Sequence, residues 1–140
     1  MLIALLVVLP SMTSWRAFDV PALRAAGDVL LVVGLLVAVA AALNLGDALT
    51  AMPTPRDGAA LRTHGLYRYV RHPIYAGVLA IGWGLALRSQ LWLGLLLAVL
   101  LTGVLHVKAR YEEAMLAARH DGYADYTART PRFVPRLRRR

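Results

Sequence analysis

Uncharged apolar segments alternate with short polar connections along the chain and predict helices that cross a membrane. Residues 1–15 carry no charged side chain, and residues 29–46 are rich in Leu, Val and Ala. Two further apolar segments follow later in the chain, separated only by the tight polar turn Arg88-Ser89-Gln90. A helix needs about 20 apolar residues to cross the hydrocarbon core of a bilayer. We therefore predict four transmembrane helices, at residues 1–15, 22–46, 73–88 and 90–107.

Glycines accumulate in the third and fourth apolar segments. Small residues let membrane helices approach closely, so these glycines predict that the two helices pack as a tight hairpin. Glycine is also commoner in membrane helices in general, and this alternative explanation stays open. The residues concerned are Gly77, Gly82, Gly84, Gly94 and Gly103.

The fourth apolar segment has no signal that would end its helix at the membrane surface. Residues 108–119 are good helix formers, and Gly122 is the first residue suited to cap a helix C-terminus. One helix of roughly 30 residues, about 45 Å long, would then emerge from the membrane into water. A basic tail follows, with Pro131 and Pro135. The sequence predicts a single all-α membrane domain over residues 1–140, of which residues 108–140 are a cytoplasmic helix and tail.

Basic residues are distributed unevenly between the two ends of the predicted helices. The protein has a formal net charge of +8, and most of its arginines lie in residues 47–72 and after Val107. Membrane proteins carry an excess of Lys and Arg on the cytoplasmic side. We expect the protein to lie in a bacterial inner membrane, with both termini and residues 47–72 on the cytoplasmic side. Because these basic residues border apolar segments, they favour anionic lipid over nucleic acid as the partner.

Composition argues against several kinds of site. The chain has no cysteine, which excludes disulfides, thiolate metal sites and a cysteine nucleophile. Its acidic residues are few, and its histidines are scattered without a spacing such as His-Glu-x-x-His. We therefore expect no metal, and we interpret His64 and His106 as structural.

Residues 65–77 form the most polar stretch next to an apolar segment, with two arginines, a histidine and three tyrosines. Pro73 suits the first turn of a helix, and the residue before a proline resists helical dihedrals, so His72 should lie just outside that helix. Arg71 and His72 would then flank a helix N-terminus, where free N–H groups and the helix dipole favour an anion. The sequence predicts a basic, aromatic, anion-accepting site at the membrane surface.

Two adjacent acidic residues, Glu112 and Glu113, follow the fourth apolar segment. They could be solvated partners of Lys108 and Arg110, but pairs with this order of charges stabilise a helix only weakly. We expect them instead to meet a cation. All six tyrosines lie on the predicted cytoplasmic side, either as an aromatic belt or as the walls of a site. Donors for a carboxylate, acceptors for an amine or ribose, and rings for a base or sulfonium together suit a zwitterionic, adenine-bearing ligand.

These residues together resemble the isoprenylcysteine carboxyl methyltransferase and phospholipid methyltransferase superfamily of integral membrane enzymes. The resemblance covers residues 65–135 with a highly specific combination of motifs, whereas the preceding residues match only as apolar segments. One departure is His120-Asp121-Gly122, where an aromatic residue and glycine are commoner, and it bears on local packing alone. The motifs are Gly65-x-Tyr67-x-x-Val70-Arg71-His72-Pro73-x-Tyr75-x-Gly77, Glu112-Glu113-x-x-Leu116, Gly122-x-x-x-Tyr126 and Pro131-Arg132-Phe133-x-Pro135.

The resemblance implies an S-adenosylmethionine site formed by the last two transmembrane helices and the C-terminal segment. Tyr123 and Tyr126 match the family's tail, which closes over the cofactor. For catalysis, we expect Arg71 to orient a carboxylate or phosphate acceptor, and Tyr75 or a carboxylate to act as base for an amine or thiol. No metal is implied. The residues that the resemblance assigns to the cofactor site are His72, Pro73, Tyr75, Gly77, Glu112 and Glu113.

The function that follows is an S-adenosylmethionine-dependent methyltransferase acting on a lipophilic or lipid-linked small molecule that enters from the bilayer. Two alternatives stay open: a phospholipid amine N-methyltransferase, and a non-catalytic membrane protein whose basic tail binds anionic lipid or a partner. A reductase of the same membrane architecture would need a nicotinamide site, and no dinucleotide glycine motif follows a strand in this sequence. The acceptor stays undecided among a carboxylate, an amine and a thiol.

Overall fold

The structure is a computed structural model that describes residues 19–45, 61 and 63–136. The predicted first transmembrane helix and most of the connection before residue 63 lie outside the described residues. The described part is helical and contains no β-strand. Its elements are α2 (Pro21–Leu45), the 3₁₀ helix η4 (Gly65–Arg68), α3 (Pro73–Ser89), α4 (Trp92–Arg119) and α5 (Tyr123–Arg129).

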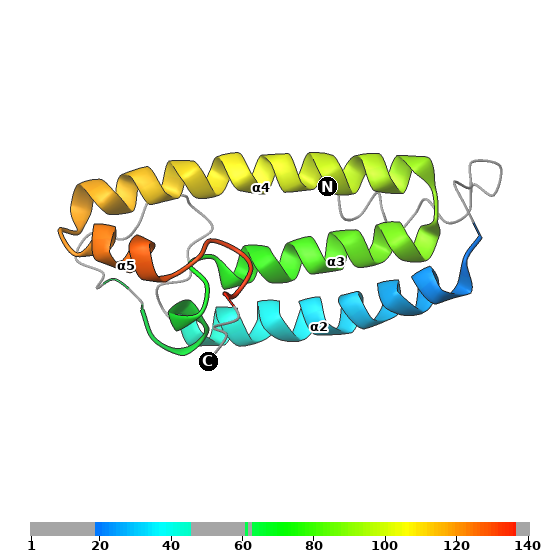
Figure 1. The fold of residues 1–140 in the computed structure, drawn as a ribbon, viewed down its shortest axis with the longest axis horizontal. Coiled ribbons are helices and arrows are strands. Elements are labelled where there is room, and N and C mark those ends of the chain that lie inside the picture. The colour runs from blue at the N-terminus through cyan, green and yellow to red at the C-terminus, as the bar shows by residue number, and fades with distance from the viewer. Residues whose placement is uncertain (1–18, 46–60, 62, 137–140) are drawn as a thin grey trace.

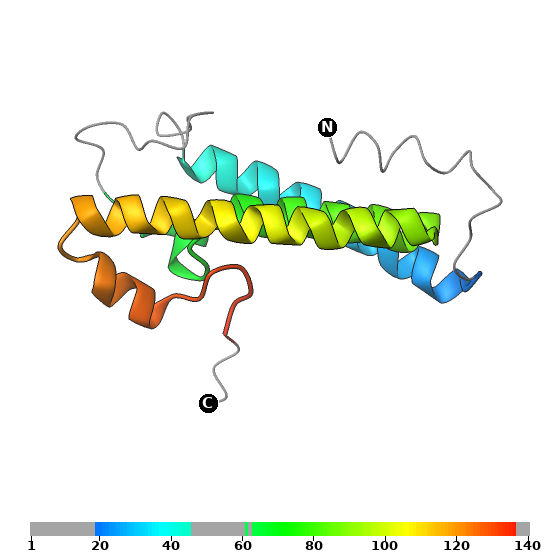
Figure 2. The same cartoon turned by 90° about the horizontal axis from the view of Figure 1, so that it is seen from above.

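The long helix α3 lies between α2 and α4 and runs antiparallel to both (Figure 1). Seen from above, α4 lies over α3, and α2 crosses behind them at an angle (Figure 2). The short helix α5 and the segment after it lie at the end of the bundle where α3 begins and α4 ends. This arrangement confirms the all-α fold class. It also gathers the polar stretch before α3, the second half of α4 and the C-terminal segment at one end.

α2 and α3 pack along a seam of glycines, Gly27 and Gly34 on α2 and Gly77 and Gly84 on α3. A Cβ atom added at Gly34 would lie 2.7 Å from the backbone oxygen of Gly77, and one added at Gly84 would lie 2.8 Å from that of Gly27. The two backbones therefore touch at both levels, which leaves no room for a side chain. The hairpin prediction was wrong about Gly77 and Gly84, which face α2 and not α4. Glycine content alone does not tell which neighbour a helix face meets.

The hairpin of α3 and α4 uses the other glycines in part. A Cβ at Gly82 would lie 2.6 Å from Leu101 Cδ2, and one at Gly94 would lie 2.7 Å from Ser89 Oγ. A Cβ at Gly103 would meet no atom of the described residues within 4 Å. The prediction of close packing between α3 and α4 is thus confirmed at Gly82 and Gly94 only.

The turn between α3 and α4 also anchors the start of α2. Gln90 adopts the left-handed conformation, with φ 55°, and is fully buried. Its Nε2 donates to the Val20 carbonyl at 2.6 Å, and its Oε1 accepts from the Val20 N–H at 3.1 Å. A residue other than glycine is uncommon in this conformation, and two buried hydrogen bonds offset the strain. The turn thereby joins all three long helices at the end of the bundle away from α5 (Figure 1).

α2 and α4, with 25 and 28 residues, are long and apolar enough to cross a membrane. Only 17% of the most apolar stretch of α2 is buried inside the protein, so most of its apolar side chains face outward. Such a surface would be an unusually large exposed patch on a soluble protein. Together these features indicate an integral membrane protein. α3 has 17 residues and is about 26 Å long; that it crosses as well, and the orientation of the bundle, stay predictions.

α4 continues well past its apolar half, as predicted, but ends at Arg119. His120 is extended, with φ −133°. Gly122 precedes the first turn of α5, so its predicted role as the cap of α4 was wrong. α5 itself lies in the predicted basic tail, where no helix was predicted from the sequence. Its Tyr123 and Tyr126 are buried, and the burial of two aromatic rings stabilises this short helix.

Candidate functional site

The polar stretch before α3 takes the conformation that its sequence predicts. His72 lies just outside α3, with φ −125° and ψ 66°, and Pro73 occupies the first helical turn. Gly65, with φ 60°, starts the stretch, and a Cβ there would collide with the side chain of Asn44 at the end of α2. The left-handed backbone conformation favours glycine at this position, whereas the close approach involves only the end of the Asn44 side chain. α2 thereby supports the stretch that carries His72.

The C-terminal segment runs beside this stretch and is hydrogen-bonded to it. The N–H group of Arg71 donates to the carbonyl of Pro131 at 2.9 Å, and that of His72 donates to the carbonyl of Arg132 at 3.0 Å. Two segments that are far apart in the sequence therefore pair over two consecutive residues. This pairing brings the tail to the N-terminus of α3.

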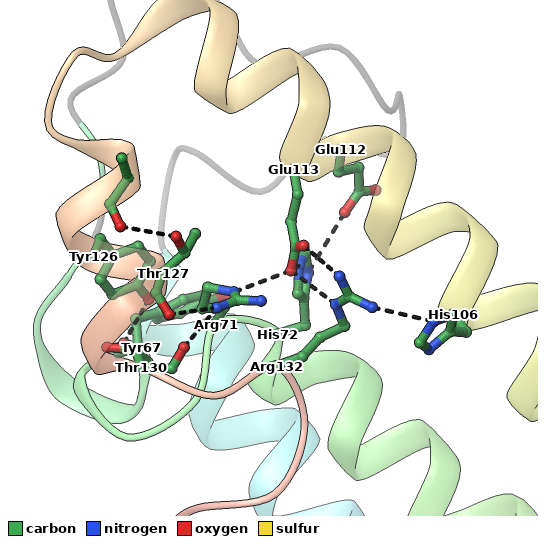
Figure 3. Close-up of polar contacts among 11 residues, drawn as sticks. Tyr67, Arg71, His72, His106, Glu112, Glu113, Tyr126, Thr127, Thr130 and Arg132 are labelled. Atoms are coloured by element: carbon green, nitrogen blue, oxygen red, sulfur yellow. Dashed lines mark hydrogen bonds and ion pairs between the residues drawn. The ribbon is translucent and has the colours of Figure 1, made fainter.

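Glu113 lies at the centre of a cluster of charged side chains from three segments (Figure 3). Its Oε1 accepts a hydrogen bond from Arg71 Nε at 3.0 Å. Arg132 binds the same carboxylate through two hydrogen bonds, from Nε to Oε1 at 3.0 Å and from Nη2 to Oε2 at 2.6 Å. His72 Nε2 lies 3.1 Å from Oε1. The anion that the sequence predicts beside Arg71 and His72 is thus supplied by the chain itself.

These partners set the ionisation of the cluster. Burial acts to raise the pKa of Glu113, but hydrogen bonds from Arg132 and Arg71, together with their charges, outweigh it and lower the pKa from 4.5 to about 2. Burial lowers the pKa of His72, and the carboxylates of Glu113 and Glu112 only partly oppose this. At neutral pH, Glu113 is therefore a carboxylate and His72 a neutral imidazole. The Nε2 of His72 carries the proton, because the Glu113 carboxylate that it contacts only accepts hydrogen bonds.

Arg71 is held by the protein on both sides of its guanidinium. Besides binding Glu113, its Nη1 donates to the carbonyls of Thr127 and Thr130, at 3.0 and 2.7 Å. Its side chain is only 11% exposed. Arg71 therefore connects Glu113 to α5 and to the residue that follows it. That Arg71 also orients an acceptor stays a prediction.

Glu112, the neighbour of Glu113 on α4, has a different environment. Its Oε1 accepts from the Tyr75 hydroxyl at 2.5 Å and lies 3.6 Å from Lys108 Nζ. Its Oε2 lies 3.7 Å from His72 Nδ1. The Lys108 ammonium also lies 5.2 Å from the centre of the Tyr75 ring, on which the His72 ring stacks at 5.3 Å. A carboxylate and an aromatic ring thus share one cation. The same two groups would hold a sulfonium or ammonium group of a ligand.

Phe133 extends the aromatic part of the cluster toward His106. Its ring centre lies 6.0 Å from that of His72 and 6.3 Å from that of His106. Arg132 Nη1 lies 3.2 Å from His106 Nε2, and since a guanidinium only donates, this nitrogen of His106 is an acceptor. The contact agrees with the structural role predicted for His106.

Tyr123 and Tyr126 fasten α5 to the stretch before α3. They are 3% and 9% exposed, and the Tyr126 hydroxyl donates to the Tyr67 carbonyl at 2.6 Å. Burial raises the pKa of Tyr67, Tyr123 and Tyr126 to about 12, so all three phenols stay neutral. Their described contacts are with protein groups.

The structure brings most of the predicted site residues into one cluster and leaves others outside it. Pro73 is fully buried at the start of α3, and Gly77 faces α2. Tyr123 and Tyr126 are buried residues of α5 and make no described hydrogen bond to the cluster, although, besides burial, the charges of Glu113 and Arg71 act on the pKa of Tyr123. The residues in the cluster are Arg71, His72, Tyr75, Glu112 and Glu113.

Sequence reasoning gave no role to Arg132, which makes two hydrogen bonds to Glu113. The available signal was its place in the motif Pro131-Arg132-Phe133-x-Pro135, which the family resemblance already included. An arginine suits a buried ion pair with a carboxylate, because its planar guanidinium can donate two parallel hydrogen bonds. Lys108 was considered only as a weak helical partner of Glu112, and its contact with Tyr75 could not be read from the spacing.

A hollow of about 820 Å³ lies beside α5. Its described lining includes Arg68, Arg129 and Arg136 but neither glutamate of α4. A hollow lined by arginines repels a cation, so a cationic ligand fits the cluster at Glu112 better than this hollow. The residues that the structure describes contain no group of three or more His, Cys, Asp or Glu placed to hold a metal ion.

Known proteins resemble this chain over much of its length. Residues 23–121 match the family described as phospholipid methyltransferase. Methanethiol S-methyltransferase 2 of Bradyrhizobium diazoefficiens is 38% identical over 85 residues, which cover 60% of this chain and 32% of that protein. The cobalt-zinc-cadmium resistance protein CzcN of Cupriavidus metallidurans is 34% identical over 86 residues, which cover 59% of this chain and 38% of that protein.

The matched part of the chain therefore spans about a third of the length of these curated relatives. The family match includes Arg71, His72, Tyr75 and both glutamates, and it ends before the tail that carries Arg132. Since residues 23–121 make up most of its 140 residues, the chain belongs to the phospholipid methyltransferase family.

Proposed function

We propose that this protein is an S-adenosylmethionine-dependent methyltransferase that acts at the cytoplasmic face of the membrane on a lipophilic or lipid-linked acceptor from the bilayer. The observation that carries the proposal is the single cluster that His72, Tyr75, Glu112 and Glu113 form between α3 and α4. These residues are among those that the family resemblance assigns to the cofactor. Membership of the phospholipid methyltransferase family supports the same activity.

The carboxylate and aromatic ring of the cluster fit the positive charge of the methyl donor. S-adenosylmethionine carries a sulfonium and an ammonium, and it supplies an activated methyl group for in-line transfer to a nucleophile. We assign one of its positive charges to the carboxylate of Glu112 and the ring of Tyr75, which already hold the Lys108 ammonium. His72, neutral and stacked on Tyr75, would keep that ring in place.

Glu113 acts as a positioning residue in this proposal. Methyl transfer needs little acid–base chemistry, so orientation and exclusion of water supply most of the rate enhancement. Glu113 orients His72 through one carboxylate oxygen and holds Arg71 and Arg132 at the same time. Through Arg132 it keeps the C-terminal segment across the start of α3, where this segment would shield the donor from water.

The acceptor decides whether a base is needed. One relative is named for methyl transfer to methanethiol, and a thiol or amine acceptor must lose a proton. The hydrogen-bonded pair of Tyr75 and Glu112 is our candidate to take it, with the phenol relaying the proton to the carboxylate. A carboxylate acceptor needs no base, and Arg71 is the candidate to orient it. A phospholipid amine N-methyltransferase is the second candidate, favoured by the description of the matching family.

The test is transfer of a labelled methyl group from S-adenosylmethionine by the full-length protein, purified in detergent. The acceptor panel contains phosphatidylethanolamine, a prenylated cysteine with a free carboxylate, and a small alkyl thiol. We expect label in one of these classes and a loss of at least about tenfold in the Glu112→Gln variant, which keeps the shape but removes the charge. The matched control is Gly103→Ala, whose added methyl group meets no described atom.

Mass spectrometry of lipid extracts from cells with and without the protein would identify a natural lipid acceptor as a pair of masses separated by one methylene. A folded protein that binds no S-adenosylmethionine and labels no acceptor would contradict the methyltransferase proposal. That outcome would favour the non-catalytic alternative, in which the basic tail binds anionic lipid.

A further inference from the structure

One side chain of the protein already occupies the place that the proposed function gives to a positive charge of the methyl donor. We call the ring of Tyr75 and the carboxylate of Glu112 the cation site. Lys108 Nζ lies 3.6 Å from Glu112 Oε1 and 5.2 Å from the centre of the Tyr75 ring. The same Oε1 accepts the Tyr75 hydroxyl. The ammonium therefore lies against both groups of the cation site.

The two glutamates of α4 differ in how firmly their counter-charges are held. Glu113 is bound by the guanidinium groups of Arg71 and Arg132, whose side chains are 11% and 25% exposed. Glu112 has the ammonium of Lys108, and the neighbouring His72 is neutral. A cation that replaced Lys108 would therefore become the counter-ion of Glu112 and leave the contacts of Glu113 intact.

Several features make Lys108 easy to displace. Its side chain is 43% exposed, whereas that of Glu112 is 19% exposed. It reaches Glu112 from one turn earlier on the same helix, which is the weaker order of charges for such a pair. A lysine carries a compact, strongly hydrated charge on a flexible stem, so the ammonium can move into water without movement of the backbone. A ligand cation that is also held by other contacts with the protein would therefore displace the Lys108 ammonium from Glu112.

We propose that Lys108 is an internal competitor of the methyl donor: its ammonium occupies the cation site and moves into solvent when a sulfonium binds there. The inference rests on the proposed function. On methyl transfer, a lone pair of the acceptor forms a bond to the methyl carbon while the bond from sulfur to that carbon breaks. The electron pair of the broken bond stays on sulfur, so the sulfonium becomes an uncharged thioether, and the product keeps its ammonium and carboxylate. Lys108 can then return, so that the carboxylate of Glu112 has a counter-ion before and after the reaction.

The experiment compares equilibrium binding of S-adenosylmethionine and of its product S-adenosylhomocysteine, whose sulfur is uncharged, to the detergent-purified full-length protein. In the Lys108→Met variant we expect the donor to bind about three- to tenfold tighter, the range that one weak ion pair and one cation–π contact support. Binding of the product should change by less than about twofold, because its uncharged sulfur does not compete with the Lys108 ammonium for the carboxylate of Glu112. Lys108→Arg, which retains a cation, should stay close to the native protein.

Two further variants separate this competition from general effects of charge. Arg110→Met removes the same charge two residues away and should leave the ratio of the two affinities unchanged. In a Glu112→Gln background the cation site is lost, so Lys108→Met should no longer tighten donor binding. The inference is overturned if Lys108→Met acts equally on both ligands, or no more than Arg110→Met does. A native protein that binds neither ligand contradicts the proposed function itself, and the inference with it.

Discussion

The body of the helix bundle and its polar end are held by different kinds of contact. Along α2 and α3, the glycine seam brings two backbones within van der Waals contact at two levels. At the polar end, Glu113 joins the start of α3, α4 and the tail through Arg71, His72 and Arg132. The first region depends on the absence of side chains, and the second depends on charges that come from distant parts of the sequence.

The glycine seam and the charge cluster around Glu113 also differ in how they respond to pH and to ligands. Close backbone packing accepts no added volume, but it does not respond to pH or to a ligand. A charge cluster responds to both, since protonation or a new cation changes which contacts are favourable. We therefore place the proposed ligand site on the region whose contacts can rearrange, with the glycine seam as its rigid support.

The largest expected effect is that of breaking the seam. Gly77→Val would push side-chain atoms into α2, where even a Cβ would lie 2.7 Å from the Gly34 oxygen. We expect it to destabilise the protein by about 3 kcal/mol. The measurement is thermal unfolding in detergent, followed by the loss of the monodisperse peak in size-exclusion chromatography. Gly103→Ala is the control and should match or slightly exceed the native stability. Equal stability of the two variants would contradict close packing of α2 on α3.

Removing the charge of Glu113 should have the next largest effect. Glu113→Gln leaves Arg71 and Arg132 without their shared carboxylate, and we expect a loss of about 2–3 kcal/mol, discounted for the partial exposure of the cluster. Limited proteolysis should then cut the tail beyond α5 faster than in the native protein. The matched control is Glu112→Gln on the neighbouring position, which should cost less than about 1 kcal/mol. Similar losses in both variants would remove the distinction between the two glutamates.

Lowering the pH should weaken the same cluster without a substitution. The pKa of Glu113 is about 2 in the folded protein and 4.5 as an ordinary carboxyl, so its contribution is complete above pH 4.5 and is lost as the pH falls toward 2. This contribution amounts to about 3 kcal/mol at most, and screening by solvent at the partly exposed cluster reduces it. We expect the stability difference between the native protein and Glu113→Gln to narrow between pH 6 and pH 3. A difference that stays constant over this range would contradict the ionised, arginine-bound state of Glu113.

The smallest effect concerns the hydrogen bond that fastens α5. Tyr126→Phe removes the bond to the Tyr67 carbonyl and leaves that buried oxygen without this donor. We expect a loss of about 1 kcal/mol in the same unfolding assay. Tyr111→Phe, at a tyrosine that is 59% exposed on α4, is the control and should be neutral. A neutral Tyr126→Phe would mean that ring packing alone holds α5.

Much of the fold could be predicted because it follows from local properties. Uncharged segments mark α2, α3 and the start of α4 to within a few residues, and Pro73 marks the start of α3. Helix-forming residues mark the continuation of α4 beyond its apolar half. The choice of neighbour could not be predicted in this way. Whether Gly77 meets α2 or α4 depends on a match with Gly34, and only the folded arrangement brings these two residues together. The short helix α5 was missed for the same reason, since its stability comes from burying two tyrosines against another segment.

The residues of the candidate site could be predicted better than the contacts that each of them makes. Family motifs pointed to His72, Tyr75, Glu112 and Glu113, and the structure brings these residues together. Adjacent residues on a helix point in directions about 100° apart, so Glu112 faces Tyr75 while Glu113 faces the tail. Which glutamate meets the arginines depends on where Arg132 returns, and the spacing of residues does not determine that.

The most direct test of the central claim is hydrogen–deuterium exchange of the full-length protein with and without S-adenosylhomocysteine, read by mass spectrometry. If one nucleoside lies between the start of α3, the second half of α4 and the tail, protection should rise together in peptides covering residues 71–76, 108–113 and 130–135. Peptides from the turn at Gln90 should not change. Saturable binding with protection confined to other segments, or to only one of the three, would contradict a site shared by these three parts of the chain.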